Sequence, residues 1–213
     1  MKGVKFAGTL ALFLAAFVWG MSFPAQTAAS EVVGPFTFIA GKSSIACLFM
    51  LVLIGLRKAT RRGASRGDTA GAGAHGVTPA PTGFFAAHRR VIIGGIVCGL
   101  VLFAADNCQQ AGISSYPAEA AASGRAGFLT ATYVVIVALL ARFMGRKLHP
   151  AVIVAVFVCL AGMYLLCVPV DQGFSGVYLG DVIMLVGALF YSLHIVAVGR
   201  FALEDALWLS AIQ

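Results

Sequence analysis

The chain alternates long apolar runs with short polar breaks, and the runs have the length of membrane-spanning helices. A helix needs about 20 residues to cross a hydrocarbon core of about 30 Å. Six runs reach that length, at residues 6–28, 34–56, 91–113, 118–142, 150–169 and 177–200. The pattern therefore predicts an all-α membrane protein, built as a multi-span helical bundle.

The composition agrees with this class. Hydrophobic residues make up 60% of the chain and charged residues 11%, whereas a soluble domain carries about 25% charged residues. The net charge of +7 would suggest a nucleic-acid partner in a soluble protein, but membrane proteins collect basic residues in cytoplasmic loops. We therefore expect the lipid bilayer, and no nucleic acid, as a partner.

The residues that usually hold metals or cofactors are scattered. All five cysteines lie in apolar runs and none forms a CxxC pair, which is typical of small packing residues. The four histidines do not cluster either. We therefore expect no metal site and no cofactor.

The basic residues predict the orientation in the membrane. Every Lys and Arg outside the apolar runs lies at the N-terminus, after the second or fourth run, or at the end of the sixth. By the positive-inside rule, the N-terminus is cytoplasmic and the protein is a multi-pass component of the cell (inner or plasma) membrane. The connection at 57–90 is rich in Gly, Ala and Pro and is predicted to be a flexible cytoplasmic loop.

The sixth run repeats the pattern of the first. A shift that carries Gly8 onto Gly180 also carries Trp19 onto Tyr191, and each copy is followed by a polar break and a new apolar start. Because five runs separate the two starts, the copies cross the membrane in opposite directions. Inverted repeats of this kind are typical of secondary transporters.

This repeat predicts the organisation of the chain. Residues 1–169 form a first repeat of five spans, and residues 177–213 open a second repeat with the sixth span and the start of a seventh. On this prediction the sequence is truncated in the second repeat.

Several stretches resemble the EamA-type transporters of the drug/metabolite transporter superfamily. They are Trp19-Gly20 with Ser22-Phe23-Pro24, the segment Gly34-Pro35-Phe36-Thr37 leading to Lys42, and SGRAGFLTATYVVIVALLARFMGRKL at 123–148. The resemblance implies ten helices in two inverted five-helix repeats, cytoplasmic termini, and export or uptake of small metabolites.

Three ionisable side chains lie inside the apolar runs at a common depth. Lys42, Asp106 and Arg125 are each about seven or eight residues, or about 10–12 Å, from the outer end of their runs. Since separate burial would cost several kcal/mol each, they should face a common interior. One interpretation is a salt-bridged triad that only fixes helix packing. In the other, one cation meets an anionic group of the substrate, because two cations face one anion.

Four further side chains complete the predicted substrate-binding or coupling set. Gln110 adds polar capacity near Asp106, and Tyr133 lies about two turns from Arg125. Trp19 and Tyr191 occupy equivalent mid-span positions of the repeat. Aromatic rings at that depth either line a cavity or simply pack. The set contains no catalytic residue.

Together these features predict a secondary active transporter of small metabolites, working by alternating access and most simply as an exporter. Its small-molecule substrates would be amino-acid-like, anionic or zwitterionic solutes or drugs. An enzyme is not expected, because an HExxH motif is absent and Gly41-Lys42-Ser43 lacks the upstream glycine of a P-loop. A channel subunit or a non-transporting scaffold remains the alternative. A chain of this length would have to assemble as a homodimer to complete a cavity by itself.

Overall fold

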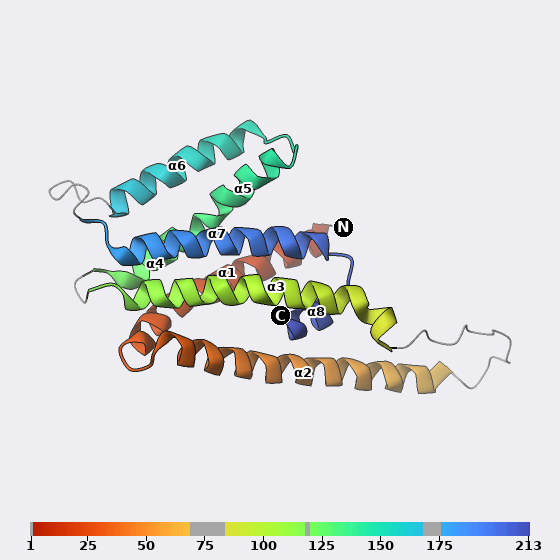
Figure 1. The fold of residues 1–213 in the computed structure, drawn as a ribbon. Helices are drawn as coiled ribbons and strands as arrows, with labels where there is room; N and C mark the ends of the chain where they lie inside the picture. The colour runs from red at the N-terminus through yellow and green to blue at the C-terminus, as the bar shows by residue number, and fades with distance from the viewer. Residues whose placement is uncertain (1, 69–83, 118–119, 168–175) are drawn as a thin grey trace. The chain divides into compact units, whose positions relative to one another are not determined.

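The computed structural model describes residues 2–68, 84–117, 120–167 and 176–213, and its elements in that part of the chain are α-helices (Figure 1). The prediction of an all-α fold is confirmed. The helices are α1 (Lys2–Ser30), α2 (Pro35–Asp68), α3 (Phe84–Ser114), α4 (Ala122–Ala131), α5 (Tyr133–Phe143), α6 (Pro150–Cys167), α7 (Leu179–Arg200) and α8 (Ala206–Ile212).

Five stretches of the described chain are long and apolar enough to cross a membrane, which confirms a multi-span membrane protein. They are Phe6–Ser30, Pro35–Thr60, Arg89–Ser114, Ala122–Phe143 and Leu179–Arg200. The remaining predicted span, 150–169, corresponds to α6, a shorter apolar helix of 18 residues. Residues 168 and 169 of that predicted span lie outside the described residues.

Both ends of the predicted loop at 57–90 are helical in the structure. Helix α2 continues to Asp68, and α3 already begins at Phe84. The residues that follow Leu56 are mainly Arg, Lys and Ala, whose high helix propensity extends α2 beyond the apolar run. Residues 69–83 of the predicted loop lie outside the described chain.

The fourth predicted span consists of two helices. Helix α4 ends at Ala131 and α5 begins at Tyr133, with Thr132 between them. The N–H of Thr132 donates to the carbonyl of Leu129 at 3.1 Å, three residues back, which is the tight hydrogen bond of a 3₁₀ turn. Hydropathy cannot reveal this break, because the run stays apolar and contains neither Pro nor Gly at this point.

The contacts divide the chain into two compact units. The first unit comprises residues 1–39 and 103–193, and the second comprises residues 40–102 and 194–213. In the first unit, α1 packs on α4, where Gly127 lets the ring of Phe23 approach. The core of this unit consists of Phe23, Ile113, Ala126, Leu129 and Met184, from α1, α3, α4 and α7.

In the second unit, the first half of α3 packs against the end of the chain. A Cβ atom at Gly94 would come within 2.8 Å of the ring of Phe201, and one at Gly99 within 2.9 Å of the backbone of Gln213. Larger residues at these positions would therefore push the α8 region away from α3.

Candidate functional site

Polar side chains enter the interior of the first unit from one face of α1 and one face of α3. On each helix these polar residues and the apolar or aromatic residues beside them recur with the spacing i, i+3, i+4 and i+7, which places them on a single side. Most of them are buried at membrane depth, where a polar side chain is costly and usually functional. The two faces consist of Trp19, Ser22, Phe23 and Gln26 on α1 and Asp106, Gln109, Gln110 and Ile113 on α3.

Three aromatic rings meet in this interior, and we call them the ring cluster: Trp19, Tyr133 and Tyr191. Their ring centres are 5.7 Å apart for Trp19 and Tyr133, and 6.4 Å apart for each of the other two pairs. The pairs are tilted or edge-on, as favourable aromatic contacts are. Because the rings come from α1, α5 and α7, the cluster joins segments that are distant in the sequence.

The hydroxyl of Tyr191 connects the ring cluster to α3. It lies within hydrogen-bond distance of the Asp106 carboxylate and, at 3.2 Å, of the Gln109 side-chain oxygen. A hydroxyl carries one proton, which the shorter contact gives to Asp106. The amide of Gln109 donates in turn to the hydroxyl of Thr130 on α4 at 3.1 Å. The carboxylate of Asp106 is therefore positioned beside the aromatic rings.

Two buried amides lie on the same helix faces. The side-chain nitrogen of Gln110 donates to the backbone carbonyl of Gln26 at 3.3 Å, and that of Gln26 donates to Ser22 Oγ at 3.0 Å. The side-chain oxygens of Gln26 and Gln110 have no hydrogen-bond partner among the described residues. An unsatisfied buried acceptor costs about 1–3 kcal/mol, so these two oxygens are energetically costly in the described structure.

Arg125 is bound at the start of α7, away from the ring cluster. Its guanidinium holds both carboxylate oxygens of Asp181, with Nε at 3.1 Å from Oδ1 and Nη2 on Oδ2. Nη2 also donates to the carbonyl of Gly176 at 3.1 Å. The side chains of Arg125 and Asp181 are only 7% and 4% exposed. This is a desolvated, bidentate ion pair.

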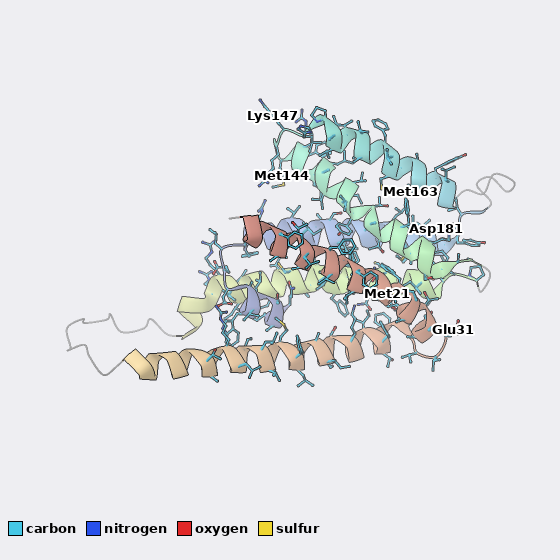
Figure 2. All side chains as sticks on the ribbon, turned by 180° about the vertical axis from the view of Figure 1, so that it is seen from behind. Met21, Glu31, Met144, Lys147, Met163 and Asp181 are labelled. Carbon is cyan, nitrogen blue, oxygen red and sulfur yellow. The ribbon has the colours of Figure 1, made fainter. Side chains whose placement is uncertain are left out.

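Two tyrosines complete this group, which we call the Asp181 cluster (Tyr116, Arg125, Gly176, Tyr178 and Asp181; Asp181 is labelled in Figure 2). Tyr116 donates its hydroxyl proton to Asp181 at 2.7 Å, and the N–H of Tyr178 donates to Asp181 at 2.9 Å. The guanidinium of Arg125 lies 4.8 Å from the ring centre of Tyr178 and 5.9 Å from that of Tyr116. Burial and the contact with Asp181 raise the pKa of Tyr116 above its ordinary value.

A second ionic group lies in the second unit, just beyond the end of α7, and we call it the Asp205 cluster (Arg57, Lys58, Arg90, Glu204, Asp205 and Trp208). Arg57 donates to both oxygens of Asp205 at 2.8 Å, and Arg90 lies 3.3 Å from Glu204. Burial alone would raise the pKa of Asp205, but the hydrogen bonds from Arg57 and from the backbone N–H of Leu207 lower it. The side chains of Arg57 and Asp205 are 38% and 35% exposed.

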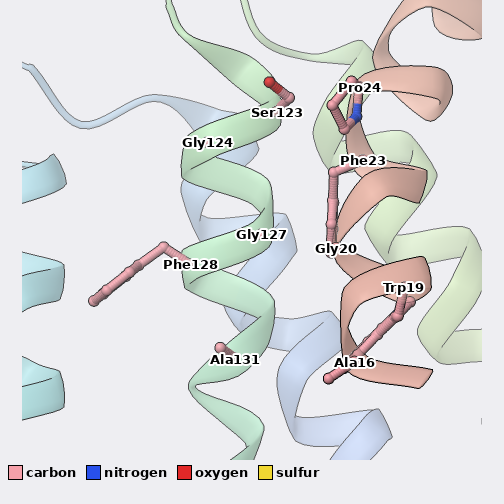
Figure 3. Close-up of a pocket in the computed structure, with 10 residues that line it drawn as sticks. All are labelled: Ala16, Trp19, Gly20, Phe23, Pro24, Ser123, Gly124, Gly127, Phe128 and Ala131. Atoms are coloured by element: carbon pink, nitrogen blue, oxygen red, sulfur yellow. The ribbon is translucent and has the colours of Figure 1, made fainter. Parts of the chain in front are cut away.

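An open groove of about 560 Å³ runs between α1 and α4 in the first unit (Figure 3). Trp19, Gly20 and Phe23 form its α1 wall, and α4 contributes Gly124 and Gly127. Its lining is mostly apolar, so it suits an apolar group better than a charged one. Trp19 belongs both to this groove and to the ring cluster.

The predicted site residues belong to both units. Trp19, Tyr133, Tyr191 and Asp106 come together, and Gln110 follows one turn after Asp106 on the same face. Arg125 lies in the Asp181 cluster instead. Lys42 is an exposed residue of α2 in the second unit.

Sequence reasoning missed Asp181 and Gln26. Asp181 lies inside the predicted span 177–200, and this position in the sequence would have been enough to predict a buried carboxylate. With Asp181 counted, two carboxylates match the two cations at interior depth, which removes the excess of positive charge that favoured an anionic substrate. Gln26 follows Trp19 by seven residues, which is the helical spacing that places both on one face.

Comparison with known proteins identifies relatives of this chain. Residues 6–168 match the model of the EamA-like transporter family. A protein of Archaeoglobus fulgidus described as an uncharacterized transporter is 26% identical over 203 residues, which cover 94% of this chain and 52% of the relative. The chain thus spans about half the length of this curated relative. No solved structure matches it significantly.

Proposed function

Because this chain belongs to the EamA-like transporter family, we propose that it carries small metabolites as a secondary active transporter. The observation that carries the proposal is the polar and aromatic interior of the first unit, within helices of membrane length. Polar side chains inside a membrane are energetically costly, and binding of a solute to them would explain why they are there. The solutes we propose are amino-acid-like, zwitterionic or anionic compounds or drugs, moved outward across the cell membrane by a protein whose N-terminus is cytoplasmic.

The relation between α1 and α7 supports inverted repeats. The two helices run in opposite directions (Figure 1). Trp19 and Tyr191, which occupy equivalent positions in the predicted repeats, have ring centres 6.4 Å apart. Two equivalent residues that touch must lie beside the axis that relates them. The ring cluster is therefore our proposed centre of the transport pathway.

The two ionic clusters support alternating access. The Asp181 cluster holds the start of α7 within the first unit, and the Asp205 cluster follows its end within the second. At 1.5 Å per residue, the 22 residues of α7 span about 33 Å, which is close to the thickness of a bilayer core. We propose that transport opens these two clusters in turn.

Reconstitution into proteoliposomes tests the proposal. Vesicles containing the full chain are loaded with a mixture of labelled amino acids, and efflux is measured with and without an imposed proton gradient. We expect efflux that saturates with solute concentration and that falls in Tyr191→Ala. A channel would give flux that does not saturate. A scaffold would give no flux above that of empty vesicles, and either result would contradict the proposal.

A further inference from the structure

We propose that a basic surface of the second unit binds the headgroup of an anionic phospholipid. Five side chains at the ends of three membrane-length helices define this surface: Arg57, Lys58, Arg89, Arg90 and Arg200. Such a site requires a bilayer around the protein, but it does not depend on the proposed transport.

The five residues lie close to the ends of their helices. The membrane-length stretch of α2 ends at Thr60, that of α3 begins at Arg89 and that of α7 ends at Arg200. Each residue of the basic surface lies within three residues of one of these ends. The end of a membrane-length helix lies near the lipid headgroups, which the long side chains of Lys and Arg reach easily. The basic surface is therefore placed at the depth of phospholipid phosphates.

Ion pairs bring the three helix ends together. The turn after α7, which follows Arg200 directly, supplies Glu204 and Asp205. Asp205 binds Arg57 of α2 at 2.8 Å, and Glu204 lies 3.3 Å from Arg90 of α3. Cations from α2, α3 and α7 therefore belong to one surface of the second unit.

Positive charge exceeds negative charge on this surface. Glu204 and Asp205 are the carboxylates among the described side chains of the second unit, so five cations face two anions, a net charge of +3. The cations are also more exposed, since the side chain of Arg90 is 76% exposed and that of its partner Glu204 only 22%. Three exposed cations have no ion-pair partner in the part of the chain that the structure describes: Lys58, Arg89 and Arg200.

Arg57 retains hydrogen-bond donors for a phosphate. Its Nη1 alone contacts both oxygens of Asp205. The donors on Nε and Nη2 have no hydrogen-bond partner among the described residues. Because the side chain of Arg57 is 38% exposed, a phosphate can reach these donors, and arginine binds phosphate oxygens through two parallel N–H groups.

Two apolar side chains beside the basic surface favour a lipid over a soluble phosphate. The ammonium of Lys58 lies 5.1 Å from the ring centre of Trp208, and tryptophan is enriched where a membrane meets water. Leu203, in the turn between α7 and α8, is 100% exposed. At the depth of the headgroups this leucine can contact acyl chains instead of water. A ligand with both a phosphate and acyl chains complements the cations and the apolar side chains together.

Fluorescence of Trp208 tests the inference. The chain has two tryptophans, so Trp19→Phe leaves Trp208 as the only one. This full-length variant is reconstituted into phosphatidylcholine vesicles that contain a small fraction of brominated phosphatidylglycerol or, separately, of brominated phosphatidylcholine. Bromine quenches tryptophan fluorescence at contact distance. We expect the anionic lipid to be enriched about fivefold or more beside Trp208.

Two results of this measurement would overturn the inference. The first is equal quenching by the two brominated lipids, whether strong or weak. The second is reversal of the quenching by dissolved glycerol 3-phosphate at the concentration of the anionic lipid, which would assign the surface to a soluble phosphate. We expect glycerol 3-phosphate to leave the quenching unchanged.

Charge variants locate the site. Arg89→Gln combined with Arg200→Gln should reduce the preference for phosphatidylglycerol about fivefold or more, while Lys58 stays beside the Trp208 ring. Both residues are exposed and outside the ion pairs, so the helices should form normally. The matched control is Arg146→Gln combined with Lys147→Gln, which removes two exposed cations of the first unit and should preserve the preference. Equal loss in the two variants would indicate general charge attraction and would contradict a site.

Native mass spectrometry gives a second readout that does not require Trp19→Phe. The unaltered chain is released from micelles that contain equal amounts of phosphatidylglycerol and phosphatidylcholine. We expect adducts of phosphatidylglycerol to predominate and to decline in the Arg89→Gln, Arg200→Gln variant. Equal adducts of the two lipids would contradict recognition of an anionic headgroup.

Discussion

The Asp181 and Asp205 clusters use similar groups but differ in their exposure to solvent. In each, an aspartate at the start of a helix accepts backbone and arginine hydrogen bonds: Asp181 at the third position of α7, and Asp205 as the N-cap of α8. The arginine and aspartate side chains are 7% and 4% exposed in the Asp181 cluster, against 38% and 35% in the Asp205 cluster.

This difference decides what each cluster can do. A buried ion pair has lost its hydration, so it is stable only while each charge has an opposite charge beside it. Removal of one partner strongly destabilises the protein. An exposed pair exchanges its partner for water at little cost. The Asp181 cluster is therefore the more stable of the two, although in each cluster an arginine contacts both oxygens of the aspartate.

The largest expected effect comes from breaking the buried pair. Arg125→Met leaves Asp181 charged in a buried site, so the free energy of unfolding should fall by about 3–5 kcal/mol. Reversible unfolding in mixed micelles measures it. The double variant Arg125→Met with Asp181→Leu removes both charges and should recover most of the loss. Equal destabilisation in the single and double variants would show that the charges do not interact as described.

Thiol accessibility sharpens the comparison between the two ends of α7. Cys108 lies on α3 in the first unit, where it packs against α7 at Gly187, and Cys98 is fully buried in the second unit. In Asp181→Asn, labelling of Cys108 by a membrane-impermeant maleimide should rise about tenfold. In Asp205→Asn, labelling of Cys98 should rise only about twofold, because the exposed cluster contributes less to closure.

Each accessibility measurement uses a chain that retains one of these two cysteines, with the others replaced by alanine. The reagent is added separately to the two faces of oriented membrane vesicles. Faster labelling of both cysteines from both faces in either variant would indicate general loosening and would contradict alternating opening of the clusters.

The exposed pair should respond to salt where the buried pair does not. Arg57→Gln should lower the free energy of unfolding by no more than about 1 kcal/mol at low salt. The loss should shrink further at about 1 M salt, where the screening length is about 3 Å. The loss caused by Arg125→Met should be nearly the same at both salt concentrations. A large, salt-independent loss in Arg57→Gln would mean that this pair is desolvated too.

The smallest expected effects are in the pH dependence of stability. The pKa of Asp205 is lowered in the folded state, so its contribution is complete above about pH 4 and is lost as the pH falls through the folded pKa. The pKa of Tyr116 is raised, so its contribution is complete below about pH 10 and is lost as the pH rises through the folded pKa. Unfolding midpoints should therefore depend less on acid in Asp205→Asn and less on alkali in Tyr116→Phe. Unaltered pH profiles would contradict these shifts.

Much of the fold followed from hydropathy, because a bilayer admits few alternatives to apolar helices of fixed length. The exceptions arose where a different force decides. Helix propensity extended α2 along a polar stretch to Asp68. In the fourth span, a hydrogen bond from the N–H of Thr132 to the carbonyl three residues back marks the break between α4 and α5. Neither feature changes the apolar pattern, so neither could be read from it.

The sequence allowed us to predict which residues of the candidate site belong together better than it allowed us to predict which side chains bind each other. Equivalent repeat positions had pointed to Trp19 and Tyr191, and the structure shows that their rings contact each other. The partner of Arg125 was not predictable, because depth in the membrane assigns a shared level but not a shared direction around the helix axis. Asp181 lies at the level of Arg125 and also on the side to which Arg125 points, although it is 56 residues away in the chain.

That separation has a consequence for the synthesis of the protein. Asp181 leaves the ribosome 56 residues after Arg125, which is about 3–11 s at a translation rate of about 5–20 residues per second. During this interval α4 must enter the bilayer before the carboxylate that will bind its arginine exists. An arginine in a span costs the insertion machinery about 2.5–3.5 kcal/mol. The nearly uninterrupted apolar sequence of α5 offsets that cost. The composition of Tyr133–Phe143 is thus constrained by the order of insertion as well as by the packing of the finished protein.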